Sequence, residues 1–359
     1  MSNKLSNCFE HIEYIQKIGS SSQQGFIHYI KFTEKSLFKH LVLKSSKSIK
    51  SDNLAYEFFA GKFINHMCEF VPCFIITHSL YRYSNDKSWK KAKYTSKVKN
   101  VANSFIKNVN YICDIDESEF INTKPCYKSK MFCILIEAIP NSISMYNYVN
   151  FMDIDLHDLS CMLYLIYFSL DMFKNKFTHY DLHMDNCLLC PYDKEIRFIV
   201  EYRNGDILNF TTKYVPKIID YGIVYFSGNE GFIDKIDCNQ IKNGFDVICC
   251  QNDDIDYICP KRSNISHDLR ILYEISAALK QNKMYDIHEQ LLKGRIIRFT
   301  NPPYGTSESE SYDDIIRNVA DAHIFFKNKC IKEKSTNHES VAGTFYLYDS
   351  GQKMRWVPI

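Results

Sequence analysis

The sequence predicts an α+β fold in two parts, with a seam near residue 140. In the first part, apolar and polar residues alternate from 26 to 32, and an apolar run at 41–43 ends in Lys44, which are patterns of strands. In the second part helical periodicity dominates, most clearly in the apolar stripe of residues 155–176. Strands followed by helices, without regular alternation, are typical of α+β folds.

Composition limits the class of protein. The chain has 359 residues, of which 45% are hydrophobic and 24% charged, and its formal net charge is +2. These values fit a globular protein with a substantial core, and the balanced charge gives no strong nucleic-acid signal. The N-terminal residues are polar, and no apolar run approaches the roughly 20 residues that a bilayer requires. We therefore expect a cytoplasmic protein that is not secreted and has no membrane partner.

The first part is expected to hold five strands, at 14–18, 26–32, 40–44, 73–83 and 131–139. A helix is expected from Leu54, since Asp52 and Asn53 are candidate N-caps. Residues 85–107 hold seven lysines against one acidic residue, and no periodic pattern is sustained there. This segment is either a solvated loop or a docking patch for an acidic partner.

The second part is expected to hold a long helix at 155–176, then a polar segment, His179–Asn186, and a short apolar strand, Cys187–Cys190. Asn204–Gly205 predicts a hairpin over 198–211, because Asn-Gly is the strongest two-residue turn signal. Further helices are expected at 266–281, 284–293 and 311–329.

The polar segment carries a carboxylate and an amide at close spacing, Asp181 and Asn186. Transfer from ATP needs a carboxylate beside the attacking hydroxyl and oxygen ligands for Mg²⁺ nearby, and this spacing on a tight loop can supply both. The pattern alone is weak, since such residues also occur in ordinary turns. Asp220 strengthens it, because an apolar run that ends in Asp-Tyr-Gly places a second carboxylate at the end of a strand.

Lys44 ends an apolar strand, where an ammonium group avoids burial unless it is paired. Glu57 lies in the following helix, whose other face is rich in phenylalanine. An ion pair between them would explain both positions. A lysine that extends to solvent and a solvated glutamate would explain each separately.

Together these features resemble the eukaryotic-type protein kinase superfamily over about residues 12–280. Its parts occur in order: Ile18–Gly19 to Gly25–Ile27, Val42–Lys44, Glu57, Leu135–Pro140, His179–Asn186 and Asp220–Gly222. In detail the chain looks closest to kinase-like proteins of large (nucleocytoplasmic) DNA viruses, which carry a similar Asp-Tyr-Gly and a hairpin before it. Ser266–Arg270 also resembles the start of the family's helix F, where an Asp, here Asp268, braces the catalytic-loop backbone.

The resemblance implies a bilobal protein-kinase-like fold, with a small antiparallel-sheet lobe and a larger, mainly helical lobe. The implied divisions are an N-lobe at 1–136 with an insertion at about 85–130, a hinge at 137–143, a C-lobe at 144–330 with a hairpin insertion at about 193–214, and a C-terminal tail at 331–359. A viral protein of this kind would act in the host cytoplasm or the virion.

The resemblance also implies catalytic roles. Asp181 would orient and deprotonate the acceptor hydroxyl, and Asn186 and Asp220 would hold Mg²⁺. Lys44, fixed by Glu57, would position the phosphates of ATP.

The implied nucleotide contacts lie in the first part. Gly19 and Gly25 bound the loop over the phosphates. Glu137 and Ile139 would offer backbone groups to adenine. The side chains that would pack around adenine are Ile18, Ile27 and Ile136.

Three departures from the family pattern concern the acceptor and the regulation. The loop between Gly19 and Gly25 lacks the family's inner glycine, and Tyr180 replaces the Arg that many protein kinases use to grip a phosphorylated activation loop. His183 stands where Ser/Thr protein kinases have a Lys, as it often does in small-molecule kinases, and a His there lies near the transferred phosphoryl.

The leading interpretation is a viral-type serine/threonine protein kinase that uses ATP and Mg²⁺. Its substrate would be a protein hydroxyl, in basic peptide segments that suit the acidic residues of 223–265. Two alternatives stay open. His183 favours a small-molecule kinase of the aminoglycoside or choline type, and the altered glycine loop favours a catalytically weak pseudokinase that acts as a binding scaffold.

Overall fold

The computed structural model describes residues 12–22, 25–32, 40–46, 54–94, 97–99, 109–111, 131–227, 263–298, 315–330 and 341–359. Its fold is mixed α+β, as the sequence predicts. Within these residues the chain divides into two compact units, 12–65 with 75–140, and 66–74 with 141–227 and 263–359. The division at Pro140 falls inside the expected hinge at 137–143. No helix of the described residues is long and apolar enough to cross a membrane.

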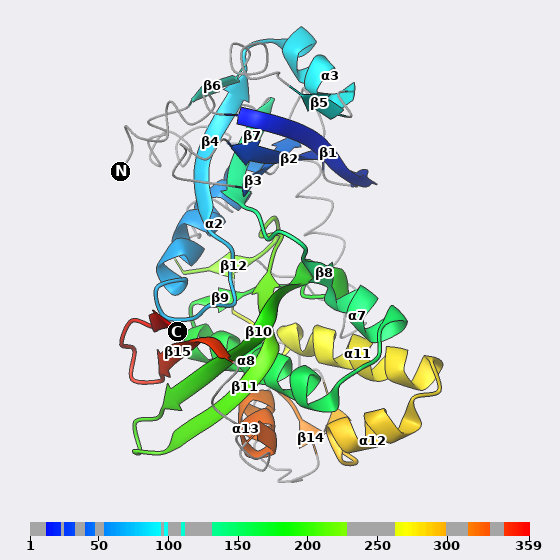
Figure 1. Ribbon diagram of the computed structural model, residues 1–359, viewed down its shortest axis with the longest axis vertical. Coiled ribbons are helices and arrows are strands. Elements are labelled where there is room, and N and C mark those ends of the chain that lie inside the picture. Colours follow the sequence, from blue (N-terminus) through cyan, green and yellow to red (C-terminus); the bar gives the residue numbers. More distant parts are fainter. Residues whose placement is uncertain are drawn as a thin grey trace. The chain divides into compact units, whose positions relative to one another are not determined.

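A seven-stranded antiparallel sheet forms the centre of the first unit, in the order β5-β1-β2-β3-β7-β4-β6 (Figure 1). The strands are β1 (Ile12–Ser22), β2 (Gly25–Phe32), β3 (His40–Ser46), β4 (Thr77–Tyr83), β5 (Lys97–Lys99), β6 (Val109–Tyr111) and β7 (Phe132–Glu137). The five expected strands are all present. The fourth starts at Thr77, later than the predicted residue 73.

One face of this sheet carries an apolar core, to which Phe26, Ile30 and Leu43 belong. The helix α3 (Asp86–Tyr94) contributes to this core. Its Trp89 ring packs edge-on against Phe26, with centroids 5.7 Å apart, and the indole N–H donates to the Ser46 carbonyl at 3.1 Å. The expectation of a solvated loop is therefore wrong for 86–94, because the many lysines of this segment obscure a short buried face of Ser88, Trp89 and Ala92. The alternative, a docking patch for an acidic partner, stays a prediction.

The helix α2 (Leu54–Met67) begins at the predicted residue and lies close to β4. A Cβ atom added at Gly61 would lie 2.1 Å from Thr77 Oγ1, so only glycine allows this approach. Asn65 reinforces the contact, because its amide donates to the Thr77 carbonyl at 2.7 Å and accepts from the Thr77 N–H at 2.9 Å.

The second unit is built around the helix α8 (Leu156–Phe173). Asp155 caps its N-terminus, because its Oδ1 accepts the N–H groups of His157 at 2.8 Å and Asp158 at 3.2 Å. All residues from Asp158 to Leu170 are buried. The sequence predicted one apolar stripe, but α8 is covered on several sides. Tyr164 packs against Phe210 of the sheet at 5.3 Å, and Tyr167 stacks on Phe326 at 6.1 Å.

Among the described residues of this unit, four further α-helices are present: α7 (Met145–Phe151), α11 (Arg270–Gln281), α12 (Tyr285–Leu292) and α13 (Val319–Cys330). The predicted helix at 311–329 is wrong in its first part. Ile315–Ile316 forms the strand β14, which pairs in parallel with β13 (Ile296–Ile297), and α13 starts only at Val319. Two β-branched residues in sequence favour a strand here.

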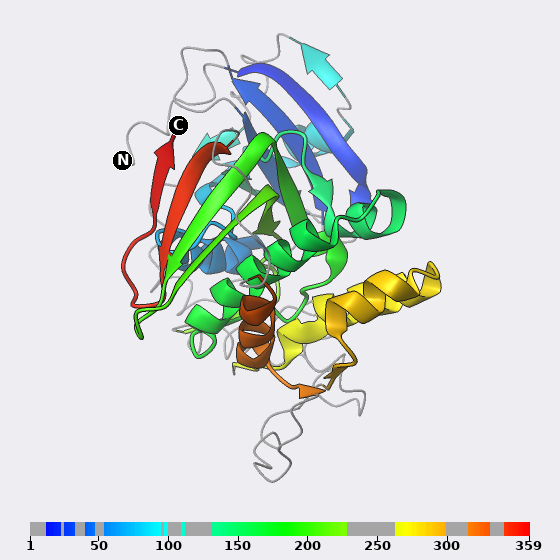
Figure 2. The ribbon, with the colours of Figure 1, turned by 60° about the horizontal axis from the view of Figure 1, so that its bottom comes forward.

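A five-stranded sheet packs beside these helices (Figure 2). Its strands are β8 (Ile143–Ser144), β10 (Cys187–Glu201), β11 (Ile207–Ile218), β15 (Val341–Tyr348) and β16 (Arg355–Pro358). β15 runs parallel to β10, and the other pairs are antiparallel. The expected C-terminal tail is thus part of the sheet from Val341 onward, and this unit contains more strand than a mainly helical lobe.

The β10–β11 hairpin turns differently from the prediction. The Gly205 N–H donates to the Tyr202 carbonyl at 2.9 Å, and the Tyr202 N–H donates to the Asp206 carbonyl at 2.9 Å. Gly205 has φ 87°, whereas Asn204 is not among the residues with positive φ. Gly205 therefore follows a turn centred on Arg203 and Asn204, as in hairpins with a glycine bulge, and Asn-Gly is not itself a two-residue turn.

Candidate active site

The polar segment 179–186 is a loop between the short strand β9 (Phe177–Thr178) and β10. Asp268, in the 3-10 turn that precedes α11, accepts hydrogen bonds from the N–H groups of His179 at 2.8 Å and Tyr180 at 3.0 Å. Asp268 is 2% exposed, and this burial raises its pKa to about 7, although the two N–H groups act to lower it. The bracing contact predicted for Asp268 is therefore present.

The backbone of the loop is held in a conformation that needs this support. Tyr180 has φ 62°, which is rare and costs about 1–2 kcal/mol for a residue with a side chain. Its ring is fully buried and packs against His267, with centroids 5.0 Å apart. We infer that Asp268 and this packing together offset the strain and set the direction in which the next residue, Asp181, extends.

His179 connects the loop to the end of β11. Its Nε2 is 2.9 Å from the Ile219 carbonyl, and its Nδ1 accepts the Asp181 N–H at 3.3 Å, so the ring is neutral with the proton on Nε2. Burial lowers its pKa to about 4, although the bond to Ile219 acts to raise it. The ring ties the loop to the end of β11.

The β10–β11 hairpin explains why Asn186 and Asp220 lie close together. Cys187 pairs with Ile218, so the residues on either side of the hairpin meet at its open end. The Asn186 carbonyl accepts the Ile219 N–H at 3.0 Å, and Asp220 follows with φ 66°. Asn186 and Asp220 are 34 positions apart in the sequence, and the register of this one hairpin brings them together.

Asp181 completes this cluster. The Asn186 side-chain amide donates to the Asp181 carbonyl at 2.9 Å, and the charge of Asp220 acts to raise the pKa of the Asp181 carboxyl group. Burial is the larger cause of that raised pKa, while His183 and Arg270 act to lower it. The three predicted residues, Asp181, Asn186 and Asp220, are thus brought into one site by elements of a single unit.

Two residues of this site were not predicted. Arg270 Nη1 lies 3.2 Å from Asp181 Oδ1, and Arg270 Nε donates to Glu274 Oε1 at 3.0 Å. Glu274 Oε2 in turn accepts the Met184 N–H of the loop at 3.0 Å. Their spacing of four residues on α11 was a usable signal, since it places both on one helix face, but the sequence gives no sign that this face meets the loop.

His183 lies on the other side of the carboxylate. Its Nδ1 accepts the Asp185 N–H at 3.2 Å, which leaves the proton on Nε2, and Nε2 is 3.9 Å from Asp181 Oδ2. Asp181 therefore lies between a permanent cation and an imidazole. Both favour its ionised form.

In the first unit, Lys44 Nζ lies 2.8 Å from Glu57 Oε1, so the predicted ion pair is formed. The two side chains are only 7% and 4% exposed. Cross-strand register aligns Ile18 with Ile27 and Ile27 with Lys44, which puts these three side chains on one face of the sheet. This is the face opposite the apolar core.

Ile136 lies on that same face, because it pairs with Val42, two residues from Lys44. Ile18 is 37% exposed, so the row of isoleucines is not closed over by the rest of its unit. Ile18 and Ile136 are 118 positions apart in the sequence. The sheet places them at the two edges of one surface, beside the buried ammonium group of Lys44. That surface can receive a flat apolar group.

The remaining nucleotide-binding candidates lie at the ends of strands. Gly19 is in β1, and Gly25 begins β2 opposite Ser22, while residues 23–24 lie outside the described residues. The Glu137 N–H already donates to the Ile76 carbonyl at 2.8 Å. This N–H is therefore engaged within the first unit, and the expectation that Glu137 offers a backbone group to adenine stays a prediction. Ile139 follows β7 in a segment without regular structure.

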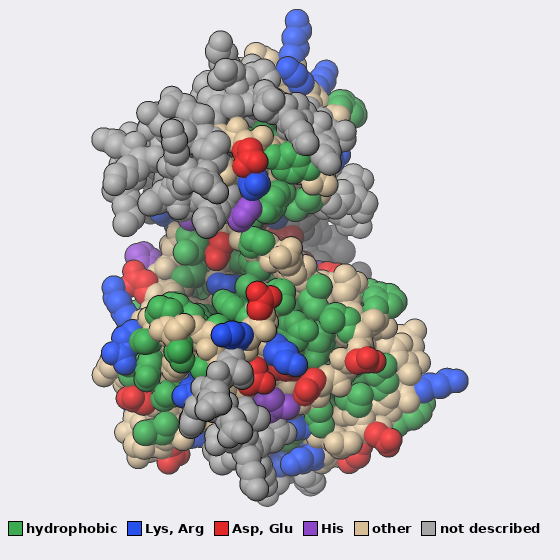
Figure 3. All heavy atoms as spheres, viewed as in Figure 1, with side chains coloured by type: hydrophobic (Ala, Val, Ile, Leu, Met, Phe, Trp, Pro, Cys, Tyr) green, Lys and Arg blue, Asp and Glu red, His purple; other side chains and the backbone are tan. Residues whose placement is uncertain are grey.

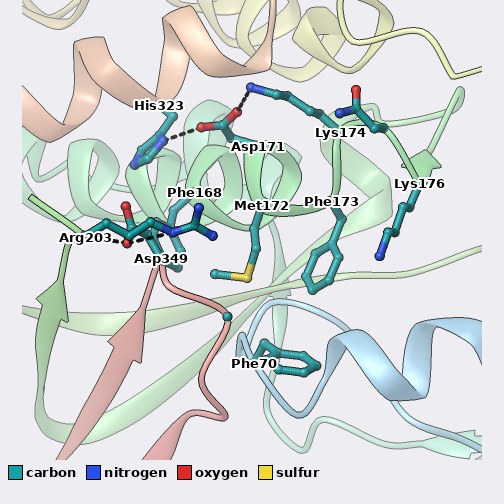
Figure 4. A pocket seen from close by; sticks show the side chains of 12 residues that line it. Phe70, Phe168, Asp171, Met172, Phe173, Lys174, Lys176, Arg203, His323 and Asp349 are labelled. Atoms are coloured by element: carbon teal, nitrogen blue, oxygen red, sulfur yellow. Dashed lines mark hydrogen bonds and ion pairs between the residues drawn. The ribbon is translucent and has the colours of Figure 1, made fainter.

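A pocket of about 680 Å³ in the second unit contains none of the predicted residues (Figure 4). Asp171 lies at its edge and is 2.8 Å from His323 Nδ1 and 2.9 Å from Lys174 Nζ. Although burial acts to raise the pKa of Asp171, these two partners lower it overall. The other ring nitrogen of His323, Nε2, lies 3.2 Å from the Tyr202 hydroxyl. These contacts join α8, α13 and the hairpin, so we assign them to the stability of the unit.

Charged side chains of both signs are mixed over the face of the second unit seen in Figure 3. No protein-family model matches the chain, and no curated protein matches its sequence.

Proposed function

We propose that the protein is a Mg²⁺- and ATP-dependent phosphotransferase with a bilobal protein-kinase-like fold, of the type found in kinase-like proteins of large DNA viruses. The observation that carries the proposal is the cluster of Asp181, Asn186 and Asp220 on a loop braced by Asp268. The ion pair of Lys44 with Glu57 supports it independently from the first unit.

The cluster has the groups that the chemistry requires. Asp181 orients the acceptor hydroxyl and takes up its proton as the oxygen attacks the γ-phosphorus. The charges of His183 and Arg270 act to lower the pKa of this carboxyl group and so oppose the larger effect of burial, which raises it. The raised pKa of Asp181 brings it nearer to the working pH, which suits a general base.

Asn186 and Asp220 fit a Mg²⁺ ion by their donor atoms. The Asn186 Nδ2 is used by the Asp181 carbonyl, so Oδ1 is turned away from that bond and is the atom that can ligate a metal. An amide oxygen, a carboxylate and phosphate oxygens form the usual ligand set of this ion. Mg²⁺, when bound, neutralises charge on the phosphates.

The first unit would hold the nucleotide. Lys44 would contact the phosphates, because Glu57 fixes its ammonium group in one position. Ile18, Ile27 and Ile136 would pack against adenine. Gly19 and Gly25 would bound the loop over the phosphates, and Glu137 and Ile139 would offer backbone groups to adenine.

The proposed acceptor is a serine or threonine hydroxyl of a protein. A small-molecule acceptor is the second candidate, and the position of His183 beside Asp181 favours it. The acidic segment that suits a basic peptide lies mostly at 228–262, outside the described residues. Of the segment 223–265, the structure describes residues 223–227 and 263–265.

Transfer of radiolabelled phosphoryl from ATP tests the proposal. Wild-type protein, Asp181→Asn and Asp185→Asn are assayed with Mg²⁺ on basic Ser/Thr peptides and on aminoglycosides, choline and sugars. Asp185 is the matched control, because its exposed carboxylate lies in the same loop. We expect transfer to peptides that Asp181→Asn lowers by a hundredfold or more and Asp185→Asn leaves intact. Transfer to small molecules alone would change the acceptor class, and no transfer to either would refute the function and favour a scaffold.

A further inference from the structure

The pocket of about 680 Å³ drawn in Figure 4 has no part in the proposed function. Its volume lies within the roughly 300–1,000 Å³ that is usual for sites of small molecules. All its lining residues belong to the second unit, and they come from five segments: the turn after α2, the end of α8, the tip of the β10–β11 hairpin, α13 and the β15–β16 turn. The pocket is thus a product of the tertiary fold of this unit.

One side of the pocket is apolar and largely aromatic. Phe70 and Phe173 meet edge to face, with ring centroids 6.2 Å apart, and both rings are half-buried. Met172 is half-buried as well, and Figure 4 shows Met172 and Phe173 extending from α8 on the side of Phe70. Ring edges and a polarisable sulfur atom favour contact with a flat aromatic group.

Hydrogen bonds fix the walls around this apolar side. The Arg203 N–H donates to Asp349 Oδ1 at 2.7 Å, and the Asp349 N–H donates to the Glu201 carbonyl at 3.1 Å, so the hairpin and the β15–β16 turn are joined. The Met354 N–H donates to the Glu69 carbonyl at 2.9 Å, which joins the same turn to the turn after α2. A ligand would therefore enter a preformed site and would not have to order it.

The carboxylates that line the pocket already have partners. Asp171 contacts Lys174 Nζ at 2.9 Å and His323 Nδ1 at 2.8 Å. Asp349 accepts the Arg203 N–H, and Arg203 Nε lies 4.0 Å from the same oxygen. Each carboxylate thus has a cationic neighbour, so the pocket offers little to a cationic ligand.

Lys176 is the cation of the lining whose charge is left over. Its backbone is fixed, because its N–H donates to the Phe173 carbonyl at 2.8 Å and its carbonyl accepts the Ser227 N–H at 2.8 Å. Its ammonium group makes no hydrogen bond or ion pair with the part of the chain that the structure describes, and neither does the side-chain amide of Asn175. An ammonium group has three donors and no acceptor, so the partner that suits it is an anionic oxygen.

We propose that this pocket binds a flat aromatic compound that carries an anionic group, of the aryl carboxylate, sulfonate or phosphate class. The ring system lies against Phe70, Met172 and Phe173, and the anionic oxygens accept hydrogen bonds from Lys176. A neutral aromatic compound leaves the ammonium group without an acceptor, and a cationic compound is repelled by it. Binding does not require phosphoryl transfer.

Two fluorescent dyes test the charge of the ligand. Anilinonaphthalene sulfonate and phenylnaphthylamine share one aromatic framework, and only the first carries a sulfonate. In titrations of the full chain, we expect the sulfonate to bind about tenfold more tightly than the neutral dye. Lys176→Gln should remove this advantage and leave binding of the neutral dye unchanged. Lys280→Gln is the matched control, because its exposed ammonium group lies on α11 outside the pocket.

A second pair of variants tests the location, since such dyes also bind to exposed apolar side chains elsewhere. Phe173→Leu should weaken both dyes about threefold or more, because one aromatic contact is lost. Phe151→Leu should leave both unchanged, because Phe151 is 74% exposed on α7 and outside the pocket.

Three results would overturn the proposal: no binding of the sulfonate dye or equal affinity for the two dyes, binding of the sulfonate dye that Lys176→Gln leaves unchanged, or equal losses in Phe151→Leu and Phe173→Leu. Thermal melting of each variant checks that it is folded. Asp181→Asn should bind the sulfonate dye as the wild-type protein does. Loss of dye binding and loss of phosphoryl transfer are therefore separate results, and either idea can fail without the other.

Discussion

The buried ion pair of Lys44 with Glu57 makes a prediction in which stability and activity separate. Lys44→Met removes the cation and leaves the Glu57 carboxylate with 4% of its side chain exposed. Removing one partner of a buried pair typically costs about 3–5 kcal/mol, because the remaining charge is desolvated without compensation. That is a large part of the roughly 5–15 kcal/mol by which a domain is stable.

The double variant Lys44→Met/Glu57→Leu removes both charges and keeps a similar volume. Replacing a buried ion pair by apolar residues is often neutral or stabilising, so we expect this variant to unfold within about 1 kcal/mol of the wild-type protein. Phosphoryl transfer should stay lost in both variants, since neither has an ammonium group to hold the phosphates. Recovery of stability without recovery of activity is the specific outcome.

A tryptophan of the first unit allows this measurement. The chain has two tryptophans, and Trp89 belongs to the core of the first unit while Trp356 lies in β16 of the second. In a Trp356→Phe background, fluorescence during urea unfolding reports on Trp89 alone. At a slope of about 2 kcal/mol per molar urea, a loss of 3–5 kcal/mol lowers the midpoint by roughly 2 M.

Two results would refute this reasoning. A loss below about 1 kcal/mol in Lys44→Met would mean that the pair is solvated, as surface pairs are. Normal transfer by the stable double variant would mean that Lys44 does not contact the phosphates.

Three further predictions concern the cluster around Asp181. Asp220→Ala should lower Mg²⁺-dependent transfer about a hundredfold or more while thermal melting changes little, and near-normal rates would remove Asp220 from the site. Phosphatase treatment should leave the basal rate intact, because Tyr180 is a buried phenol and cannot grip a phosphorylated loop; a large drop that autophosphorylation restores would contradict this. Arg270→Met should shift the acid limb of the pH–rate profile to higher pH. Asp181 works as a base only when it is ionised. Burial already raises its pKa, and loss of the Arg270 charge raises this pKa further. An acid limb that does not move would show that Arg270 does not act on Asp181.

The fold was predictable where local pattern and environment agree. The strands of the first unit alternate between a core face and a partly open face, so their period is visible in the sequence. The helix α3 was missed because four of its nine residues are lysines and only Ser88, Trp89 and Ala92 are buried. The strand β15 could not be predicted, since its parallel partner β10 lies about 145 residues earlier and nothing local indicates such pairing.

The candidate site was predictable as a set of residues more than as a geometry. Asp181 and Asn186 share one tight loop, and Asp220 joins them through the register of a hairpin whose strands the sequence indicates. Arg270 and Glu274 were not assigned, because their contacts depend on how α11 packs against the loop. A helix sequence specifies which of its residues share a face but not which loop that face meets.

Arg270 bears directly on the acceptor. His183, which stands in place of the lysine of the Ser/Thr protein kinase pattern, favours a small-molecule acceptor. A lysine there would supply a permanent cation near the reacting groups, and an imidazole supplies one only when protonated. Arg270 restores such a cation 3.2 Å from Asp181, and a guanidinium stays charged at any working pH. Because Arg270 of α11 supplies this positive charge, the absence of a lysine at position 183 does not by itself remove protein-kinase chemistry. The substitution at residue 183 is therefore weaker support for a small-molecule acceptor than the sequence alone suggests, and a protein hydroxyl remains the acceptor that we propose.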